Sequence, residues 1–233
     1  MATIRILSGG AAQAVVERVA TVFRRETGND ISADFSAVGA MKAKVLAGEP
    51  VDLVILTAPL VEELIRSGHV LPGTRSDLGK VGTGVAVRAG TPLPDVSNAE
   101  MLRGNMMAAA RIVCPDPAVA TAGKVVMNLV DKLGIASQVK EKMQYFPNGY
   151  AAMRWLAAST GTLEMGITQI TEILPNKGVT LAGPLPEELQ VKTTYSAGLA
   201  AQARHPDAAR DFMSYLTAPA ARDILAAAGF ELN

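Results

Sequence analysis

Cysteine is almost absent from this chain, and its scarcity excludes two kinds of architecture. The single cysteine, Cys114, leaves no partner for an intrachain disulfide and excludes a cysteine-rich metal site. It ends the run Arg111–Cys114, whose three residues after the arginine are apolar and predict a buried strand. We therefore expect a small thiol in the core, and we expect neither a metal site nor a cofactor.

Aromatic residues and net charge are also scarce. Aromatics make up 4% of the residues, so stacking platforms for bases or sugars are not expected to dominate recognition. The 22 Lys and Arg residues balance the 22 Asp and Glu residues, which argues against a nucleic-acid partner, because such a partner requires a basic surface.

Long hydrophobic runs are missing as well. The apolar stretches have the length of strands, so no membrane insertion is expected. No signal peptide is visible, because the first strand begins within four residues of Met1. The expected location is the periplasm if a leader was removed, and the cytoplasm otherwise.

What the chain does contain is a regular alternation of strand and helix patterns. Its 233 residues, 49% of them hydrophobic and 19% charged, suffice for two lobes with cores of their own. The order predicts an α/β protein in which a second lobe, residues 82–194, is inserted into a first lobe of residues 1–81 and 195–233. We expect a mostly parallel sheet flanked by helices in each lobe, a ligand cleft between the lobes, and a monomer.

The patterns predict particular elements. The expected strands cover residues 3–8, 31–35, 51–56, 82–87, 111–114, 163–168, 179–182 and 192–201. The expected helices cover residues 11–26, 39–47, 121–133 and 150–158, with others beginning at Pro59 and after Pro206.

The run Ser8-Gly9-Gly10-Ala11 joins the first strand to the first helix. Small residues at this position let a ligand approach the first N–H groups of the helix. These groups have no partner within the helix, and the helix dipole favours a negative charge beside them. The sequence therefore predicts an anion site at this turn, and the arrangement recurs further along the chain.

Several stretches together resemble the molybdate-type periplasmic solute-binding proteins. The resemblance covers essentially the whole chain and implies the two-lobed, type II periplasmic-binding-protein fold. It also implies that the protein delivers its solute to a transporter. The stretches that carry it are Ile6–Ala14, Phe35–Gly39, Ala47–Leu53, Asp116-Pro117 with Thr121–Gly123, and Leu216–Phe230.

The resemblance also implies which residues hold the ligand. In that family, backbone N–H groups, two serine hydroxyls and a tyrosine bind a tetrahedral oxyanion. The serines fall on Ala11 and Gly39 and the tyrosine falls on Gln169, whereas the backbone loops are kept at Ala122-Gly123 and Asn148–Tyr150. The implied ligand-binding residues are Ser8, Gly9, Gly10, Ala11, Val38, Gly39, Ala40, Met41, Lys42, Thr121, Ala122, Gly123, Lys124, Asn148, Gly149, Tyr150 and Gln169.

The missing hydroxyls change the expected anion. Each lost charge-assisted hydrogen bond costs about 1.5–3 kcal/mol, so three losses would weaken molybdate binding by several decades. Ala11 and Gly39 widen the site, and Gln169 and Asn148 both donate and accept hydrogen bonds. We therefore expect an organic carboxylate rather than molybdate.

Several of these residues have a plainer explanation. Lys42 and Lys124 fall in first helical turns, where a bound anion would offset the unfavourable dipole, but their side chains could equally point into water. Met41 and Tyr150 could pack in a core instead of lining a pocket, and so could Ser8.

Two functions follow. The first is a solute-binding protein that captures a small anion and delivers it to the membrane component of an ABC transporter. The second is an isomerase of small unsaturated carboxylates, because aconitate isomerase resembles the same family. Such an enzyme needs a positioned base, and Tyr150, Lys42 and Lys124 are the titratable groups that the sequence brings to the loops. We assign no catalytic residue from the sequence.

Overall fold

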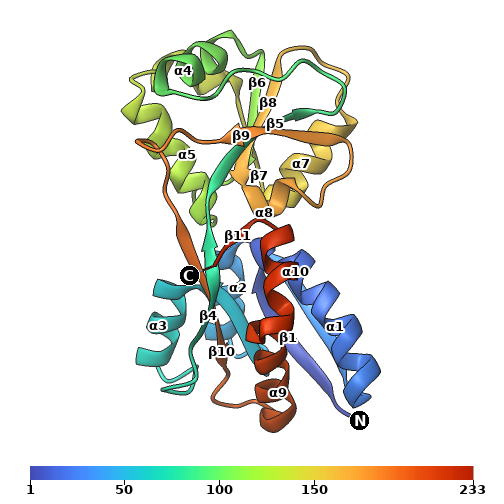
Figure 1. The fold of residues 1–233 in the computed structure, drawn as a ribbon. Helices are drawn as coiled ribbons and strands as arrows, with labels where there is room; N and C mark the ends of the chain where they lie inside the picture. Colours follow the sequence, from blue (N-terminus) through green and yellow to red (C-terminus); the bar gives the residue numbers. More distant parts are fainter. Residues whose placement is uncertain (233) are drawn as a thin grey trace. The chain divides into compact units, whose positions relative to one another are not determined.

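The computed structural model describes residues 1–232, and these divide into two compact units. The first contains residues 1–81 together with the chain from Thr193 onward, and the second contains Gly82–Lys192. Each unit has its own sheet and its own hydrophobic core. The second unit is thus an insertion between two parts of the first (Figure 1).

The first unit is built on a six-stranded sheet with the order β11-β4-β10-β3-β1-β2. Its strands are β1 (Thr3–Gly9), β2 (Asp30–Ser36), β3 (Leu53–Thr57), β4 (Ser76–Val81), β10 (Thr193–Leu199) and β11 (Phe230–Glu231). Its helices are α1 (Gln13–Thr27), α2 (Val38–Leu46), α3 (Ala58–Arg66), α9 (Pro206–Thr217) and α10 (Arg222–Ala227), with short 3-10 turns η1 (Gly10–Ala12) and η3 (Pro219–Ala221).

Helices pack in two groups on this sheet. Helix α1 packs on α9 and α10, whereas α2 packs on α3 (Figure 1). Right-handed crossovers explain the two groups, because β2 and β3 lie on opposite sides of β1. The buried core includes Ile6, Phe23 and Phe212, whose two rings meet edge to face at 5.1 Å.

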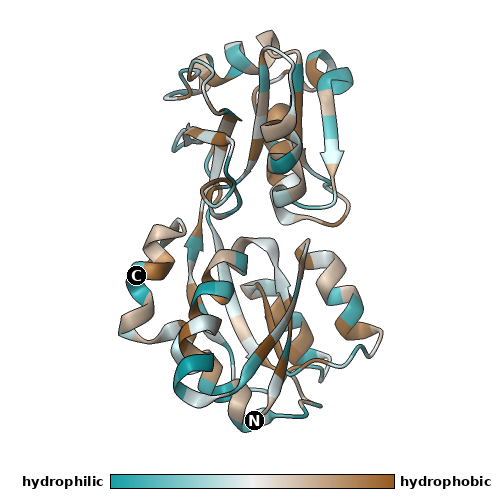
Figure 2. Cartoon of the chain, turned by 90° about the vertical axis from the view of Figure 1, so that its right-hand side faces the viewer, coloured by the Kyte–Doolittle hydropathy of each residue, from teal (hydrophilic) through white to brown (hydrophobic). Residues whose placement is uncertain are grey.

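The second unit is built on a five-stranded sheet with the order β7-β6-β8-β5-β9. Its strands are β5 (Thr83–Arg88), β6 (Arg111–Pro115), β7 (Met143–Phe146), β8 (Glu164–Gln169) and β9 (Val179–Pro184). Its helices are α4 (Ala99–Ala108), α5 (Thr121–Lys132), α6 (Ala136–Val139), α7 (Gly149–Ala158) and α8 (Ile170–Ile173), with the 3-10 turn η2 (Lys140–Lys142). Hydrophobic and hydrophilic residues are interspersed along the helices (Figure 2).

Both sheets are mixed, which corrects the expectation of mostly parallel sheets. Only β3, β1 and β2 pair in parallel in the first unit, and only β7, β6 and β8 in the second. Strands β4, β5, β9, β10 and β11 pair antiparallel. The antiparallel strands are those that carry the chain between the units or that follow the insertion, so they do not belong to strand–helix–strand crossovers.

The buried Asp52 ties three segments of the first unit together. One carboxyl oxygen accepts a hydrogen bond of 2.8 Å from the N–H of Arg5. The other accepts bonds of 2.6 and 2.9 Å from the N–H groups of Arg204 and His205, just before α9. This acidic residue, which lies within one of the family-like stretches, therefore has a structural role.

Candidate functional site

The turn between β1 and α1 is tightly packed. A Cβ atom on Gly9 would lie 2.6 Å from Val38 Cγ1, so glycine lets the start of α2 approach this turn closely. The hydroxyl of Ser8 is fully buried and donates to the carbonyl of Gly9 at 3.0 Å. Ala11 is also buried, and the expected start of the helix is a 3-10 turn, Gly10–Ala12, that precedes α1.

The start of α2 is more accessible. Its N-cap residue, Ala37, offers no side-chain oxygen and therefore does not cap the first N–H groups of the helix. Gly39 is half-buried, Met41 packs in the core, and the ammonium of Lys42 pairs with the carboxylate of Glu63 on α3. Lys42 therefore lies at the expected turn with its charge already balanced.

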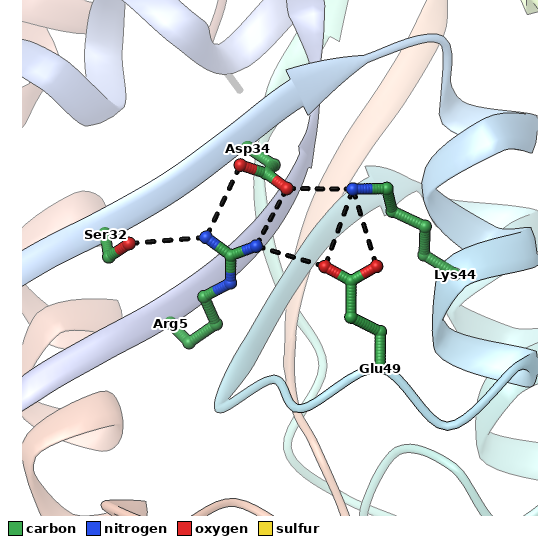
Figure 3. A network of polar contacts seen from close by, with 5 residues as sticks. All are labelled: Arg5, Ser32, Asp34, Lys44 and Glu49. Atoms are coloured by element: carbon green, nitrogen blue, oxygen red, sulfur yellow. Dashed lines mark hydrogen bonds and ion pairs between the residues drawn. The ribbon is translucent and has the colours of Figure 1, made fainter.

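A network of charged side chains fixes α2 against the sheet (Figure 3). Arg5 on β1 donates to Asp34 on β2 at 2.8 Å and to Glu49 beyond α2 at 3.0 Å. Lys44 on α2 donates to the same Asp34 at 2.9 Å and lies 3.4 Å from Glu49. The Lys44 ammonium, together with Arg5, holds the pKa of Asp34 below its usual range. The network orients the helix whose first turn is the candidate site.

In the second unit, the N-cap residue of α5 also has no side chain that could cap the helix. This residue is Ala120, and the first residues of the helix are Thr121, Ala122 and Gly123. A Cβ atom on Gly123 would lie 2.4 Å from the carbonyl oxygen of Pro115, so glycine allows α5 to touch the end of β6. Lys124 is exposed.

The start of α7 differs from the others because side chains already cap it. The side chain of Asn148 accepts a hydrogen bond of 2.8 Å from the N–H of Ala151. The N–H of Gly149 donates to the carboxyl group of Glu172. Tyr150, on the first turn, is 9% exposed and packs in the unit. The first N–H of this helix is thus used within the protein.

Glu172 is the functional candidate that the sequence analysis missed. It is 4% exposed and lies on α8, three residues beyond Gln169, which is also buried. Its carboxyl group accepts a hydrogen bond of 2.6 Å from the hydroxyl of Thr168 at the end of β8. Burial raises the pKa of this carboxyl to about 7, although the bonds from Thr168 and from the N–H of Gly149 oppose the rise.

The structure therefore brings some of the expected residues together within each unit. Gly9 contacts Val38 in the first unit. In the second unit, the N–H of Gly149 and the hydroxyl of Thr168 both donate to Glu172. Gln169 directly follows Thr168 in the chain. The i, i+4 spacing of Thr168 and Glu172 was the available sequence signal, but it does not show that the carboxyl is buried.

A separate pocket of about 290 Å³ lies at the other end of β5 and β8. Its lining is mainly apolar and includes Pro92 and Leu163, together with Arg88. Leu163 has a φ of 55°, which is uncommon for a residue other than glycine. This pocket contains none of the residues expected to bind the anion.

Residues 1–232 show two further absences. They contain no group of three or more His, Cys, Asp or Glu side chains arranged to hold a metal ion. None of their helices combines the length and hydropathy that a membrane crossing requires.

Comparison with known proteins gives the family. The model of the family described as bacterial extracellular solute-binding protein matches residues 4–231. The chain belongs to this family. The expected resemblance to molybdate-type binding proteins is confirmed, and so is the two-lobed α/β fold, apart from the strand directions corrected above.

Individual relatives of the chain have names that denote two different functions. The chain is 26% identical over 223 residues to an aconitate isomerase from Pseudomonas sp., covering 92% of this chain and 82% of that protein. It is 21% identical to the molybdate-binding protein ModA of Escherichia coli (strain K12), covering 99% of this chain and 89% of the relative. The structure of the periplasmic molybdate-binding protein of Azotobacter vinelandii matches with a TM-score of 0.84 and 20% identity, covering 99% of both chains.

Proposed function

We propose that this solute-binding protein captures a small organic carboxylate and delivers it to an ABC-type transporter. The observation that carries the proposal is a pair of helix starts, at Val38 and Thr121, whose N-cap residues are alanines and so offer no side-chain oxygen. Uncapped N–H groups beside small residues are donors for an anion. Membership of a solute-binding family supports the binding of a solute by these donors.

The class of anion follows from what replaces the family's side-chain donors. Ala11, Gly39 and Gln169 stand where the resemblance expects hydroxyls, so fewer donors remain for a compact tetrahedral oxyanion. Di- and tricarboxylates are larger than a tetrahedral oxyanion and spread their charge over separate carboxylate groups. A site with small side chains and an amide suits such a ligand. Exposed Lys124 adds a positive charge beside one of the helix starts.

Thermal unfolding with a panel of anions tests this proposal. Molybdate, sulfate, citrate and trans-aconitate would each be added to the protein, with sodium chloride at matched ionic strength as the control. A ligand at 100 times its Kd stabilises the native state by about 2.7 kcal/mol. We expect stabilisation by a di- or tricarboxylate and little from molybdate. Stabilisation by molybdate alone would overturn the carboxylate assignment, and no response to any anion would overturn the function.

One observation favours an isomerase as the second candidate. The aconitate isomerase relative covers most of the chain, and Glu172 is a buried carboxyl whose pKa is raised to about 7. General acid–base catalysis requires a group that titrates near the working pH. Proton transfer beside a carboxylate-bearing carbon would interconvert cis- and trans-aconitate.

An absorbance assay separates the two candidates. Wild-type protein and Glu172→Gln would be incubated with cis-aconitate and with trans-aconitate at high protein concentration. Interconversion by the wild type that the substitution abolishes would support the enzyme. Unchanged spectra, together with thermal stabilisation by the same anion, would support solute binding without isomerase activity.

A further inference from the structure

The pocket of about 290 Å³ in the second unit is separate from the residues expected to bind the solute. Strand β5 ends at Arg88 and the antiparallel strand β8 begins at Glu164, so both residues lie at the same edge of the sheet. The turn after β5, with Pro92 and Pro94, and the end of α4 supply further walls. The volume lies near the lower end of the range for small-molecule pockets, which are likewise mainly apolar.

Arg88 gives this pocket a positive charge that no carboxylate balances. Its guanidinium forms no ion pair within residues 1–232, and its buried Nε–H has no hydrogen-bond partner there. The other charged residue of the lining is Glu164, which lies 3.6 Å from Arg111 Nε and accepts a hydrogen bond from the hydroxyl of Ser159. A buried donor without an acceptor is unfavourable, so the pocket favours a ligand that brings a single negative charge.

Two neutral polar side chains of the lining are engaged within the protein. The amide of Asn105 donates to the carbonyls of Asp95 and Met101 at 2.7 and 2.9 Å. The hydroxyl of Thr91 donates to the carbonyl of Arg88 at 2.6 Å. The guanidinium of Arg88 is therefore the charged donor that a ligand would meet, and the apolar walls would contact the rest of that ligand.

Leu163, which also lines the pocket, is unfavourable for the protein alone in two respects. Its φ of 55° lies in the left-handed region that favours glycine, and its apolar side chain is 70% exposed. Its carbonyl accepts a hydrogen bond of 2.8 Å from the N–H of Ala110, which holds the backbone in this conformation. Strained residues of this kind cluster at ligand sites, and a ligand with an apolar body would cover the exposed side chain.

We propose that this pocket is a second ligand site, which binds a small monocarboxylate with an apolar body, either a short fatty acid or an aromatic acid. The carboxylate accepts hydrogen bonds from Arg88, and the apolar body contacts Pro92 and Leu163. This chemistry differs from that of the proposed solute, because the pocket offers one guanidinium and apolar walls instead of helix N–H groups. The site lies within the second unit and does not depend on the proposed function.

Protein NMR with benzoate and hexanoate as probes tests the site. Each probe would be titrated into isotope-labelled protein, with benzyl alcohol and hexanol as the neutral counterparts. We expect the shifted amide signals to lie at residues 87–94, 105–109 and 161–165. The Kd of each neutral compound should be about ten- to a hundredfold higher, because a charge-assisted hydrogen bond is lost. Shifts that lie only elsewhere, or equal Kd values for benzoate and benzyl alcohol, would overturn the proposal.

Two variants assign the binding to particular residues. Arg88→Gln should raise the Kd of benzoate about ten- to a hundredfold, whereas Arg103→Gln, at an exposed position of α4 outside the lining, should leave it unchanged. Leu163→Gly should raise the Kd several-fold in a protein that still folds, because glycine adopts a positive φ without strain. An unchanged Kd in Arg88→Gln, or the same rise in Arg103→Gln, would contradict the role of the guanidinium.

Competition with trans-aconitate separates this site from the one expected for the solute. The shifts caused by benzoate should be the same with and without a large molar excess of trans-aconitate. Their disappearance would show that benzoate binds where the solute does, and would overturn the second site. The absence of any response to benzoate and hexanoate would also overturn it, and would leave the proposed solute binding untouched.

Discussion

The hydroxyl of Thr168 donates a hydrogen bond of 2.6 Å to the carboxyl group of Glu172, and both residues are buried. Thr168 lies at the end of β8 and Glu172 on α8, so the bond spans the junction between the strand and the short helix. The N–H of Gly149 donates to the same carboxyl. The neighbouring hydroxyl of Thr171 is fully buried and has no hydrogen-bond partner among residues 1–232. This polar cluster lies within the second unit.

The stability of the protein should depend on the charge of Glu172. Its pKa is raised from 4.5 to about 7 on folding, so its contribution is most favourable below pH 4.5 and is lost as the pH rises to about 7. At about 1.4 kcal/mol per unit, the loss is about 3 kcal/mol. Glu172→Gln should remove this loss. Urea unfolding from pH 5 to 8 would measure it, and an equal pH dependence in both proteins would contradict the expectation.

Gly149→Ala should destabilise the protein. The added Cβ would lie 2.0 Å from Glu172 Oε2 and 2.3 Å from Thr168 Oγ1, so the buried cluster must move. Overpacking of this kind costs about 1–3 kcal/mol. Gly104→Ala is the matched control, because Gly104 lies in α4 with nothing within 4 Å of an added Cβ. The control should be neutral or stabilising by about 0.5–1 kcal/mol. Equal urea midpoints for the two variants would show that the close contact is unimportant.

Gly39→Ser should shift the anion preference toward molybdate. The substitution returns a hydroxyl to the uncapped start of α2, where Gly39 is half-buried. A regained charge-assisted hydrogen bond contributes about 1.5–3 kcal/mol, or about one to two decades in affinity. Ala43→Ser, on an exposed position of the same helix, is the control. Titration with molybdate measures both, and an identical response of the two variants would argue against an anion at this turn.

Arg5→Met should weaken the attachment of α2 to the sheet. Arg5 bridges Asp34 and Glu49 with its side chain 32% exposed, so we expect a loss of about 1 kcal/mol, which salt should reduce. Since the pKa of Asp34 is lowered in the folded protein, the contribution of the network is present at neutral pH and is lost as acid protonates this carboxyl. Arg25→Met, which removes an exposed pair with Glu26, should have little effect. Equal losses in the two variants at pH 7 would rule out a special role for the network.

Cys114 should be unreactive in the native state. Burial raises the pKa of its thiol to about 12, and nearby Asp116 adds to the rise, so almost no thiolate exists at pH 8. A chromogenic disulfide reagent should label the thiol only at the rate of unfolding, and completely in urea. Rapid labelling of the folded protein would show that β6 opens.

The sequence predicted those elements whose residues carry a strong periodicity. The helices at α1, α5 and α7 and the strands at β1, β8 and β10 lie close to their expected ranges, because the apolar spacing and the terminating glycines are local signals. Strand β4 was missed, because Ser76–Val81 is polar and contains Gly79. It forms a strand by pairing with β10 and β11, which lie more than a hundred residues further along the chain.

The sequence by itself determined the α/β class, the glycine-rich turns and the lack of material for a disulfide or a basic surface. Those properties depend on composition and on local spacing. The tertiary structure decided where the carboxyl of Glu172 lies, and its burial there raises the pKa. The alanines before α2 and α5 and Asn148 before α7 are local features of the sequence, whereas the bond from the N–H of Gly149 to Glu172 joins α7 to α8 and depends on folding. A pKa follows from burial and from hydrogen bonds to residues such as Gly149, and only folding brings these together.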